Sequence, residues 1–322
     1  MKKVLVTEPI HPDGLAVLEQ HPDIEMVCLP ACDQASLLAA VGDAHGMLVR
    51  TATIDAAVIA AAPELAVVSR HGVGCDNIAV AALNARSIPM AIAASANSTS
   101  VAEHVIMMMM VLAKNPFAYH QASTQGRFHD RGRFRMTELA GKTMLIIGFG
   151  RIGRKLAPLC KAFGMRVVVA DLVPDTELAL SLGCEPTTDF KPWLAQADFV
   201  SVHVPLDEQT RNLIDAPELT QMPEHAILIN CARGGIVNEA ALARVMLDGK
   251  LAGLGTDVFE QEPPQPDDPM LSLPNTILTP HAAALTEEGK RRMAVEAAQN
   301  IVDCFAGRLG AGQLFNAAAL GL

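Results

Sequence analysis

Short apolar runs alternate with helix-like patterns along most of the chain. Such an alternation predicts βα units that build a parallel sheet. In the first hundred residues we expect strands at 4–6, 24–28, 46–50, 66–69 and 89–92. Further along we expect strands at 143–147, 166–170, 199–204, 226–230, 252–257 and 276–279. Two separate series of strands predict two α/β domains within one chain.

Helices are expected before, between and after the two series. Ser100 and Glu103 have the spacing of a capping box, with Ser100 as the N-cap, and an apolar run follows. This helix should end near Lys114, because Pro116 disfavours helical backbone at the residue before it. The polar segment 117–136 is expected to be a surface loop or a short helix, and residues 287–305 are expected to be helical.

Composition narrows the protein class. Half of the 322 residues are apolar and 19% are charged, which excludes general disorder. Aromatic residues make up only 4%, which favours helices packed on parallel sheets over a β-sandwich. The net charge of −10 argues against a nucleic-acid partner and against an anionic membrane surface.

Cysteine usage and the first residues bear on the compartment. The seven cysteines form no CxxC pair, and we interpret them as reduced thiols of a cytoplasmic protein without disulfides or zinc. The apolar run after Lys3 is broken too early for a signal peptide. The longest apolar run, 105–113, is far shorter than the ~20 residues that span a bilayer. A soluble protein is therefore expected.

A dinucleotide fingerprint follows the expected strand 143–147. Gly148 permits a tight turn, Gly150 lets the backbone approach a pyrophosphate, and Gly153 lets the next helix pack on the strand. Arg151 and Ile152 would offer their N–H groups to the phosphates at the positive end of that helix. The spacing predicts an NAD site.

Asp171 ends the next expected strand, where a carboxylate accepts both ribose hydroxyls. The same charge repels a 2′-phosphate, and no arginine follows in residues 172–175, so NAD is favoured over NADP. The alternative is that Asp171 only caps a helix.

Three loops after later apolar runs each carry one reactive side chain. Arg233 precedes two glycines, Glu262 precedes a proline, and His281 follows Thr279 and Pro280. Arginine can grip a carboxylate through two parallel hydrogen bonds, histidine can exchange a proton near neutrality, and a carboxylate can raise the pKa of that histidine.

Each of these three residues has a plainer alternative. Arg233 could be a surface arginine bonded to a carbonyl, and Glu262 could be a solvated loop charge. Glu260 competes with Glu262 as the partner of the histidine.

Together these motifs resemble the D-isomer-specific 2-hydroxyacid dehydrogenases, over nearly the whole chain to about residue 305. The resemblance implies two doubly wound parallel-sheet domains: a Rossmann NAD domain, residues 100–284, inserted in a flavodoxin-like substrate domain formed by residues 1–99 and 285–322. It implies an NAD-dependent enzyme that moves a hydride between NAD(H) and a small 2-hydroxy or 2-keto acid, such as 3-phosphoglycerate, hydroxypyruvate or glyoxylate. Substrate would bind in a cleft between the domains, and no metal is implied.

Roles in the resembled family carry over to matching residues. Arg233 would bind the substrate carboxylate, and His281, held by Glu262, would exchange the proton on oxygen. The family uses the position of Asp257 beside the nicotinamide carboxamide. We also assign Val204, Pro205, Cys231 and Ala232 to cofactor binding, and we expect a homodimer formed through the NAD domain.

In the first domain, the resemblance assigns the N–H groups of Val73 and Gly74 to the substrate carboxylate. The glycine-rich segment 71–77 is also consistent with a purely structural turn. Arg50 and Arg70 end expected neighbouring strands, where phosphoglycerate dehydrogenases have arginines for a distal phosphate. His71 replaces the small residue that many of those enzymes carry.

A run of arginines lies in the segment between the two series of strands. Such a run is typical of a solvated face, but one member, Arg131, could reach a neighbouring site. The run comprises Arg127, Arg131, Arg133 and Arg135.

Other protein classes are less consistent with the sequence. An NAD-sensing corepressor shares this scaffold, but the long disordered tail of such proteins is not seen. Formate dehydrogenases pair the histidine with glutamine, whereas Glu262 stands here. The regulatory C-terminal domain of many serine-pathway enzymes is also not seen, so feedback by serine is not expected.

Overall fold

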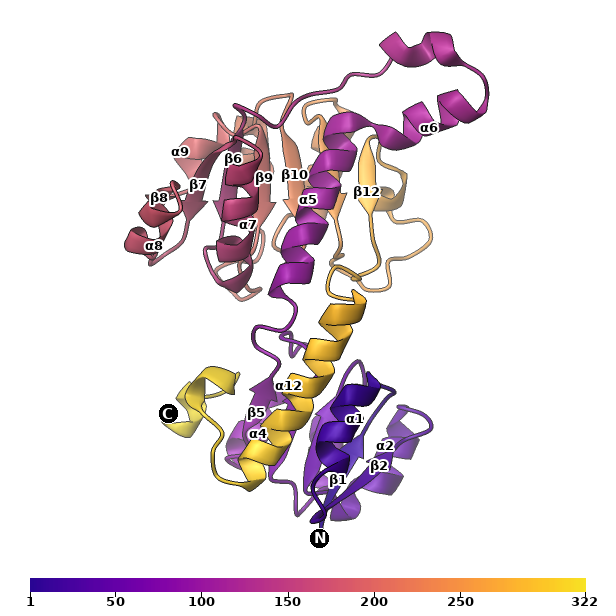
Figure 1. Ribbon diagram of the computed structural model, residues 1–322, viewed down its shortest axis with the longest axis vertical. Coiled ribbons are helices and arrows are strands. Elements are labelled where there is room, and N and C mark those ends of the chain that lie inside the picture. Colours follow the sequence, from indigo (N-terminus) through magenta and orange to yellow (C-terminus); the bar gives the residue numbers. More distant parts are fainter. The chain divides into compact units, whose positions relative to one another are not determined.

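The computed structural model describes residues 1–322 and divides into two compact units. Unit 1 comprises Met1–Asn97 and Leu285–Leu322, and unit 2 comprises Ser98–Ala284 (Figure 1). Each unit is built on one wholly parallel sheet. None of the helices combines the length and the apolar composition that crossing a bilayer requires.

Unit 1 contains a five-stranded sheet in the order β2-β1-β3-β4-β5. This is the strand order of flavodoxin-like folds, so the fold class predicted for this part of the chain is confirmed. The strands are β1 Lys2–Val6, β2 Ile24–Cys28, β3 Gly46–Val49, β4 Val67–Arg70 and β5 Met90–Ile92. The helices are α1 Pro12–Glu19, α2 Gln34–Ala40, α3 Ala56–Ala60, α4 Val80–Ala85 and α12 Glu287–Phe305.

The two faces of the unit 1 sheet are covered by different helices. Val4 and Val6 of β1 face the cluster that includes Leu18 of α1 and Ile301 of α12, while Leu5 faces the opposite cluster. Alternate strand residues point to opposite faces, so one apolar run contributes to two cores. Burial on both faces explains why β3 and β5 appear in the sequence as short continuous apolar runs, whereas the edge strand β2 is partly exposed and includes Glu25.

Unit 2 contains a seven-stranded sheet in the order β12-β11-β10-β9-β6-β7-β8. Counted within the unit, the first strand, β6, lies beside the second and the fourth, which is the Rossmann order. The strands are β6 Thr143–Ile147, β7 Arg166–Ala170, β8 Glu185–Thr187, β9 Phe199–Val202, β10 Ile227–Asn230, β11 Gly253–Thr256 and β12 Thr276–Leu278. The order reverses between β6 and β9, the position where doubly wound folds bind their ligands.

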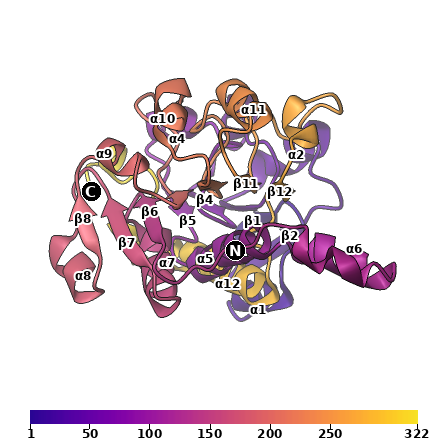
Figure 2. The same ribbon diagram turned by 90° about the horizontal axis from the view of Figure 1, so that it is seen from above.

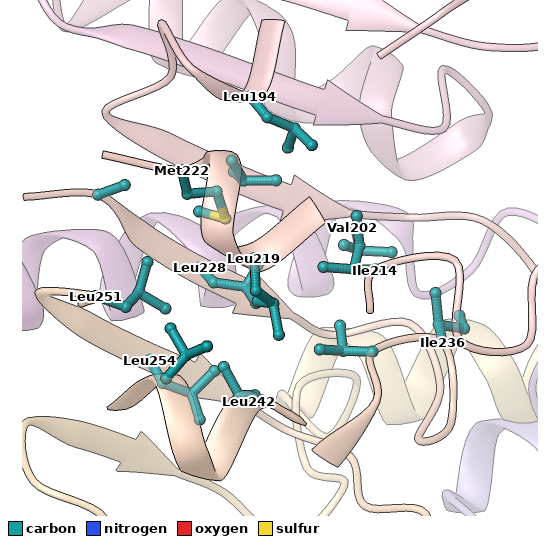
Figure 3. Packing of buried hydrophobic residues seen from close by; sticks show 14 of the residues in the cluster. Leu194, Val202, Ile214, Leu219, Met222, Leu228, Ile236, Leu242, Leu251 and Leu254 are labelled. Atoms are coloured by element: carbon teal, nitrogen blue, oxygen red, sulfur yellow. The ribbon is translucent and has the colours of Figure 1, made fainter. Parts of the chain in front are cut away.

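Helices cover both faces of this sheet (Figure 2). One core joins α5 and α7 to the sheet; the other joins α9, α10 and α11 to it through side chains such as Leu194, Leu219 and Leu242 (Figure 3). The helices are α5 Ser98–Lys114, α6 Pro116–Thr124, α7 Arg151–Ala162, α8 Thr176–Ser181, α9 Lys191–Leu194, α10 Ala216–Gln221 and α11 Glu239–Leu247.

Two elements differ from the sequence-based expectations. Helix α5 begins at Ser98, so Ser100 is a buried residue inside the helix and the predicted N-cap at Ser100 is wrong. Residues 97–100 are all competent N-cap types, and local pattern does not choose among them. Strand β8 was not predicted, because Glu185–Thr187 is polar and contains Pro186, as edge strands often do.

The segment expected to be a loop or short helix forms α6 and a 3-10 turn, Phe128–Gly132. In Figure 1, α6 runs outward from the end of α5, away from the rest of unit 2. Helix α5 ends at Lys114, as Pro116 predicts, and α12 has the bounds that the pattern predicts.

The imidazole of His203, directly after β9, makes the stability of unit 2 depend on pH. Its Nε2 lies 2.8 Å from Ser201 Oγ, and its buried Nδ1 has no hydrogen-bond partner. Burial lowers the pKa of His203 to about 4. The unfolded chain therefore binds more protons than the folded one between an ordinary pKa of about 6.5 and about 4, so stability falls as the pH falls through that window.

We expect the free energy of unfolding to drop by roughly 2 kcal/mol between pH 7 and pH 5 from His203 alone. Urea titrations at the two pH values measure this drop. His203→Gln can still bond Ser201 but does not titrate, so it should lose less stability on acidification. Identical losses in the two proteins would contradict the expectation.

Candidate active site

The glycine-rich loop lies between β6 and α7 in unit 2. Gly148 has a φ of +100°, and a Cβ there would lie 2.7 Å from the backbone carbon of His203. A Cβ on Gly153 would overlap the carbonyl oxygen of Gly148, so both positions require glycine. The Cβ direction of Gly150, in contrast, meets nothing within 4 Å, which leaves space beside the first turn of α7.

Helix α7 begins at Arg151, with Gly150 as its N-cap. The N–H groups of Arg151 and Ile152 therefore lie in the first turn, where helices bind phosphate groups. This open helix start beside the strand-order reversal is consistent with a dinucleotide pyrophosphate.

Asp171 follows β7 and contacts the same loop. Its Oδ2 accepts a hydrogen bond of 2.8 Å from the Phe149 N–H, and its Oδ1 accepts one of 3.3 Å from the Val173 N–H. It does not cap α8, because Asp175 accepts from the Leu178 N–H as the N-cap of that helix. The alternative interpretation, in which Asp171 only caps a helix, is therefore wrong.

The remaining residues assigned to the cofactor lie after the neighbouring strands β9 and β10. The Val204 backbone borders Gly148, and Pro205 continues that loop. Cys231 and Ala232 are buried directly after β10. Burial, together with the charge of Asp257, raises the pKa of the Cys231 thiol, which therefore stays protonated at neutral pH.

Arg233 lies in the tight loop after β10. Asn230 holds this loop, since its Oδ1 accepts from the Ala232 N–H and its Nδ2 donates to the Arg233 carbonyl. Gly234 passes so close to the Phe259 backbone that any Cβ would overlap it. Arg233 Nη1 donates to the Ala232 carbonyl over 2.7 Å, so the carbonyl contact foreseen as an alternative is present.

His281 and Glu262 form a direct pair. His281 Nδ1 lies 2.7 Å from Glu262 Oε2, and both side chains are partly exposed. The rival carboxylate Glu260 lies 3.7 Å from Arg211 instead. Because Nδ1 faces Glu262, Nε2 is the imidazole atom that remains to meet a substrate.

Electrostatics link all three reactive side chains. Partial burial raises the pKa of Glu262, but hydrogen bonds from His281 and from the Phe259 N–H, with the charges of His281 and Arg233, outweigh it. The net effect lowers the pKa of Glu262. The carboxylate is thus ionised at neutral pH and can stabilise a protonated His281.

Asp257 is a buried carboxylate with an anchoring function that the sequence did not indicate. It accepts hydrogen bonds from the Thr279 hydroxyl at 2.5 Å and from the N–H groups of Ala282 and Ala283 at 2.8 Å. Its own carbonyl accepts from the His281 N–H at 2.8 Å. Asp257 therefore fixes the loop that carries His281.

A second carboxylate supports the loop that carries Glu262. Glu239, at the start of α11, accepts a hydrogen bond of 2.6 Å from the Glu260 N–H. Burial raises the pKa of Glu239 to about 7, aided by the charges of Asp268, Glu260 and Glu262 and opposed by the Glu260 N–H. No motif in the sequence distinguishes Glu239 from an ordinary helix N-terminal glutamate.

In unit 1, the segment 71–77 follows β4. No acceptor within unit 1 pairs with the N–H of Val73 or Gly74, whereas Asn77 Nδ2 bonds the Ala52 carbonyl over 2.7 Å. Both interpretations of this segment thus find support: Asn77 fixes the turn, and two N–H groups are available to a ligand. Arg70 Nη1 donates to the His71 carbonyl over 2.7 Å.

Unit 1 also contains a cavity of about 260 Å³. It is lined by Pro9, Ile10, His11, Pro12, Arg50, His71, Glu287 and Lys290. His71 is buried, its Nε2 has no partner, and burial, followed by the charges of Arg50 and Arg70, lowers its pKa to about 4. Arg50 lines the cavity and Arg70 bonds the His71 carbonyl, so both arginines lie beside His71, as expected from the pairing of β3 with β4.

Glu8 holds the loop that begins at Arg50, a function that no motif in the sequence indicates. Its carboxylate accepts hydrogen bonds from the N–H groups of Arg50, Thr51 and Ala52, and from the Thr51 hydroxyl. These bonds outweigh burial, which raises the pKa of Glu8, so the net effect lowers it.

Known proteins are similar to this chain in sequence and in fold. The family model "D-isomer specific 2-hydroxyacid dehydrogenase, NAD binding domain" matches residues 106–283, more than half of the chain. The chain belongs to the D-isomer-specific 2-hydroxyacid dehydrogenase family. The matched region lies within unit 2, which is therefore the NAD-binding domain, and NAD is the cofactor.

Individual members of the D-isomer-specific 2-hydroxyacid dehydrogenase family resemble most of the chain. D-3-phosphoglycerate dehydrogenase of Methanocaldococcus jannaschii is 39% identical over 96% of this chain, which spans 58% of that protein's length. Glyoxylate reductase of Korarchaeum cryptofilum is 34% identical over 93% of this chain, and the match covers 92% of the length of that protein. D-Lactate dehydrogenase of Aquifex aeolicus, solved with NAD and lactic acid, has a TM-score of 0.85 at 27% identity and covers 96% of both chains.

Proposed function

We propose that the protein is an NAD-dependent D-2-hydroxyacid dehydrogenase. The observation that carries the proposal is the His281–Glu262 pair at 2.7 Å, with the charge of Arg233 acting on the same carboxylate. A proton donor, its stabilising carboxylate and a cation for the substrate carboxylate are the groups that keto-acid reduction requires.

Each residue has a defined task in reduction. Arg233 binds the substrate carboxylate, and its charge favours electron density on the keto oxygen. Protonated His281 donates a proton from Nε2 to that oxygen, while Glu262 stabilises the charged imidazole through Nδ1. Bound NADH supplies the hydride. We assign the N–H groups of Val73 and Gly74 to the carboxylate as well.

An assay of 2-keto acids with NADH, followed by the loss of nicotinamide absorbance, tests the proposal. Steady turnover of at least one keto acid is expected. NADH binding without turnover of any of them would favour an NAD-sensing protein on this scaffold instead.

We propose that the substrate has a second anionic or strongly polar group. The unit 1 cavity supports this, because Arg50 and Lys290 line it and Arg70 bonds the His71 carbonyl, in a chain whose net charge is −10. One charge-assisted contact is worth about 1.5–3 kcal/mol, enough for tenfold preference or more. In the same assay, kcat/KM for hydroxypyruvate, phosphohydroxypyruvate or oxaloacetate should be higher than kcat/KM for pyruvate. The opposite order would show that Arg50 and Arg70 have a structural function and do not bind the substrate.

We infer a preference for NADH over NADPH from Asp171. Its carboxylate would accept ribose hydroxyls and repel a 2′-phosphate. Asp171→Ala should lower kcat/KM for NADH and reduce the NADH-to-NADPH preference by about tenfold, corresponding to roughly 1.4 kcal/mol. The matched control is Glu177→Gln, which removes a nearby charge from α8. Equal use of both cofactors by the unaltered protein would refute the inference.

We propose a homodimer formed through unit 2. The outward-running α6 segment exposes Phe117 by 67% and Phe128 by 71%, and large exposed apolar side chains of this kind suit a protein interface. Within the arginine run, Arg127 and Arg133 pair with buried Asp130, and Arg131 lies 5.5 Å from the Phe128 ring. Of the two remaining members, Arg131 and Arg135, we assign Arg131 to a neighbouring subunit.

Light scattering tests the dimer. Changing Phe117 and Phe128 together to serine should halve the measured mass. The control is Leu247→Ser, which alters an equally exposed apolar residue at the end of α11. An unchanged mass in the double variant, or a monomeric unaltered protein, would exclude this interface.

A further inference from the structure

The loop that carries His281 has an unusual backbone. His281 has a φ of +52°, in the left-handed region that few residues other than glycine, asparagine, aspartate and histidine adopt. Such a conformation costs of order 1–3 kcal/mol and persists only where its surroundings hold it. The His281 N–H is held by the carbonyls of Asp257 at 2.8 Å and Thr279 at 3.1 Å.

A residue from a distant part of the chain completes this support. His104, on α5, places Nε2 3.0 Å from Thr279 Oγ1 and 4.0 Å from Asp257 Oδ1. Its side chain is 16% exposed, and that of Asp257 is 2% exposed. The three side chains thus form a mostly buried chain from α5 through the His281 loop to the end of β11.

The hydrogen atoms in this chain have only one arrangement. A threonine hydroxyl has a single proton, and both oxygens of the Asp257 carboxylate accept from backbone N–H groups, so Thr279 donates its proton to Oδ1 at 2.5 Å. Thr279 must therefore accept from His104, which requires a proton on Nε2. Burial lowers the pKa of His104, although the Asp257 charge opposes this, so at neutral pH the ring is neutral.

We propose that His104 is a positioning residue for the reaction: through Thr279 it holds the loop that presents His281. The inference rests on the proposed function, in which His281 donates the proton. Without the Nε2 donor, Thr279 Oγ1 loses the group that fixes its hydroxyl from the side of α5, and the loop keeps only its bonds to Asp257 and the bond from the Thr279 N–H to the Thr256 carbonyl. His281 then samples orientations in which Nε2 is not directed at the substrate.

The experiment compares two replacements of His104. His104→Leu fills the space without a donor, whereas the side-chain amide of His104→Gln can still donate to Thr279. We expect kcat to fall about tenfold or more in His104→Leu, because small misplacements of a reacting group are costly. The KM for NADH should stay within about twofold, and His104→Gln should retain most of the activity.

Thr279→Val and its combination with His104→Leu locate the effect. If His104 acts through the Thr279 hydroxyl, kcat of the double variant should be no lower than kcat of the less active single variant, since both substitutions remove the same contact. His120→Leu, on the exposed side of α6, is the control for the substitution itself. Equal losses in His104→Leu and His104→Gln, or a kcat of His104→Leu within about twofold of the unaltered protein, would overturn the proposal.

Hydrogen exchange gives a readout that does not depend on turnover. The N–H groups of His281, Ala282 and Ala283 all bond to Asp257. Their exchange should accelerate about tenfold in His104→Leu and much less in His104→Gln. If the protein reduces no keto acid but this acceleration is seen, the proposed function fails while the loop support stands. Unchanged exchange would refute the support itself.

Discussion

Replacing His281 with asparagine is expected to lower kcat for keto-acid reduction by about 10²–10⁴-fold. The variant removes the only imidazole paired with Glu262, and an amide cannot donate a proton of comparable acidity to the keto oxygen. Asparagine tolerates positive φ better than most residues, so the loop should keep its backbone at the observed +52°. Steady-state kinetics, with thermal melting to confirm folding, measure the effect.

Glu262→Gln separates the proton donor from its stabiliser. Protonated His281 is the active form in reduction, and the neutral amide stabilises it less. Activity should therefore be lost at a lower pH as the pH rises, with a moderate loss of kcat at the optimum. A variant of His281 that retains more than a few per cent of activity, or an unchanged pH profile in Glu262→Gln, would assign the proton transfer to another group.

Most of the fold could be predicted because most central strands are buried on both faces. Strands β2, β6 and β7 have the predicted bounds; β6 and β7 are apolar and buried after their first residues, Thr143 and Arg166, whereas the edge strand β2 is partly exposed and includes Glu25. The exception, β8, is a polar edge strand whose pairing with β7 depends on partners far along the chain. The start of α5 was misplaced for a related reason: several adjacent residues are competent caps.

The reactive residues could be predicted because each occupies a distinctive motif, whereas their supporting residues could not. Arg233, Glu262 and His281 stand beside glycine or proline in loops that follow apolar runs. His104 lies in an ordinary amphipathic helix, 175 residues from Thr279, and Glu239 begins another helix. Their contacts exist only after the sheet brings distant loops together, so no local pattern contains them.

Arg233→Ala is expected to lower kcat/KM by roughly 30-fold to several thousand-fold, because removing one partner of a close charge pair costs about 2–5 kcal/mol. The loss should appear both as a raised KM for the keto acid and as a lowered kcat, since the guanidinium holds the substrate before and during the reaction. Arg233→Lys should recover little, because an ammonium group cannot reproduce the paired donors of a guanidinium.

Arg211→Ala is the matched control, because it removes a guanidinium that pairs with Glu260 in the same part of unit 2. That pair is exposed and worth at most about 1 kcal/mol, so kcat/KM should change only slightly. Added guanidinium ion should partly restore Arg233→Ala and leave Arg211→Ala unchanged, since only the first variant lacks a cation that the substrate contacts. If Arg233→Ala kept the wild-type KM for the keto acid, Arg233 would not bind the substrate. The N–H groups of Val73 and Gly74 would then be the groups that bind its carboxylate.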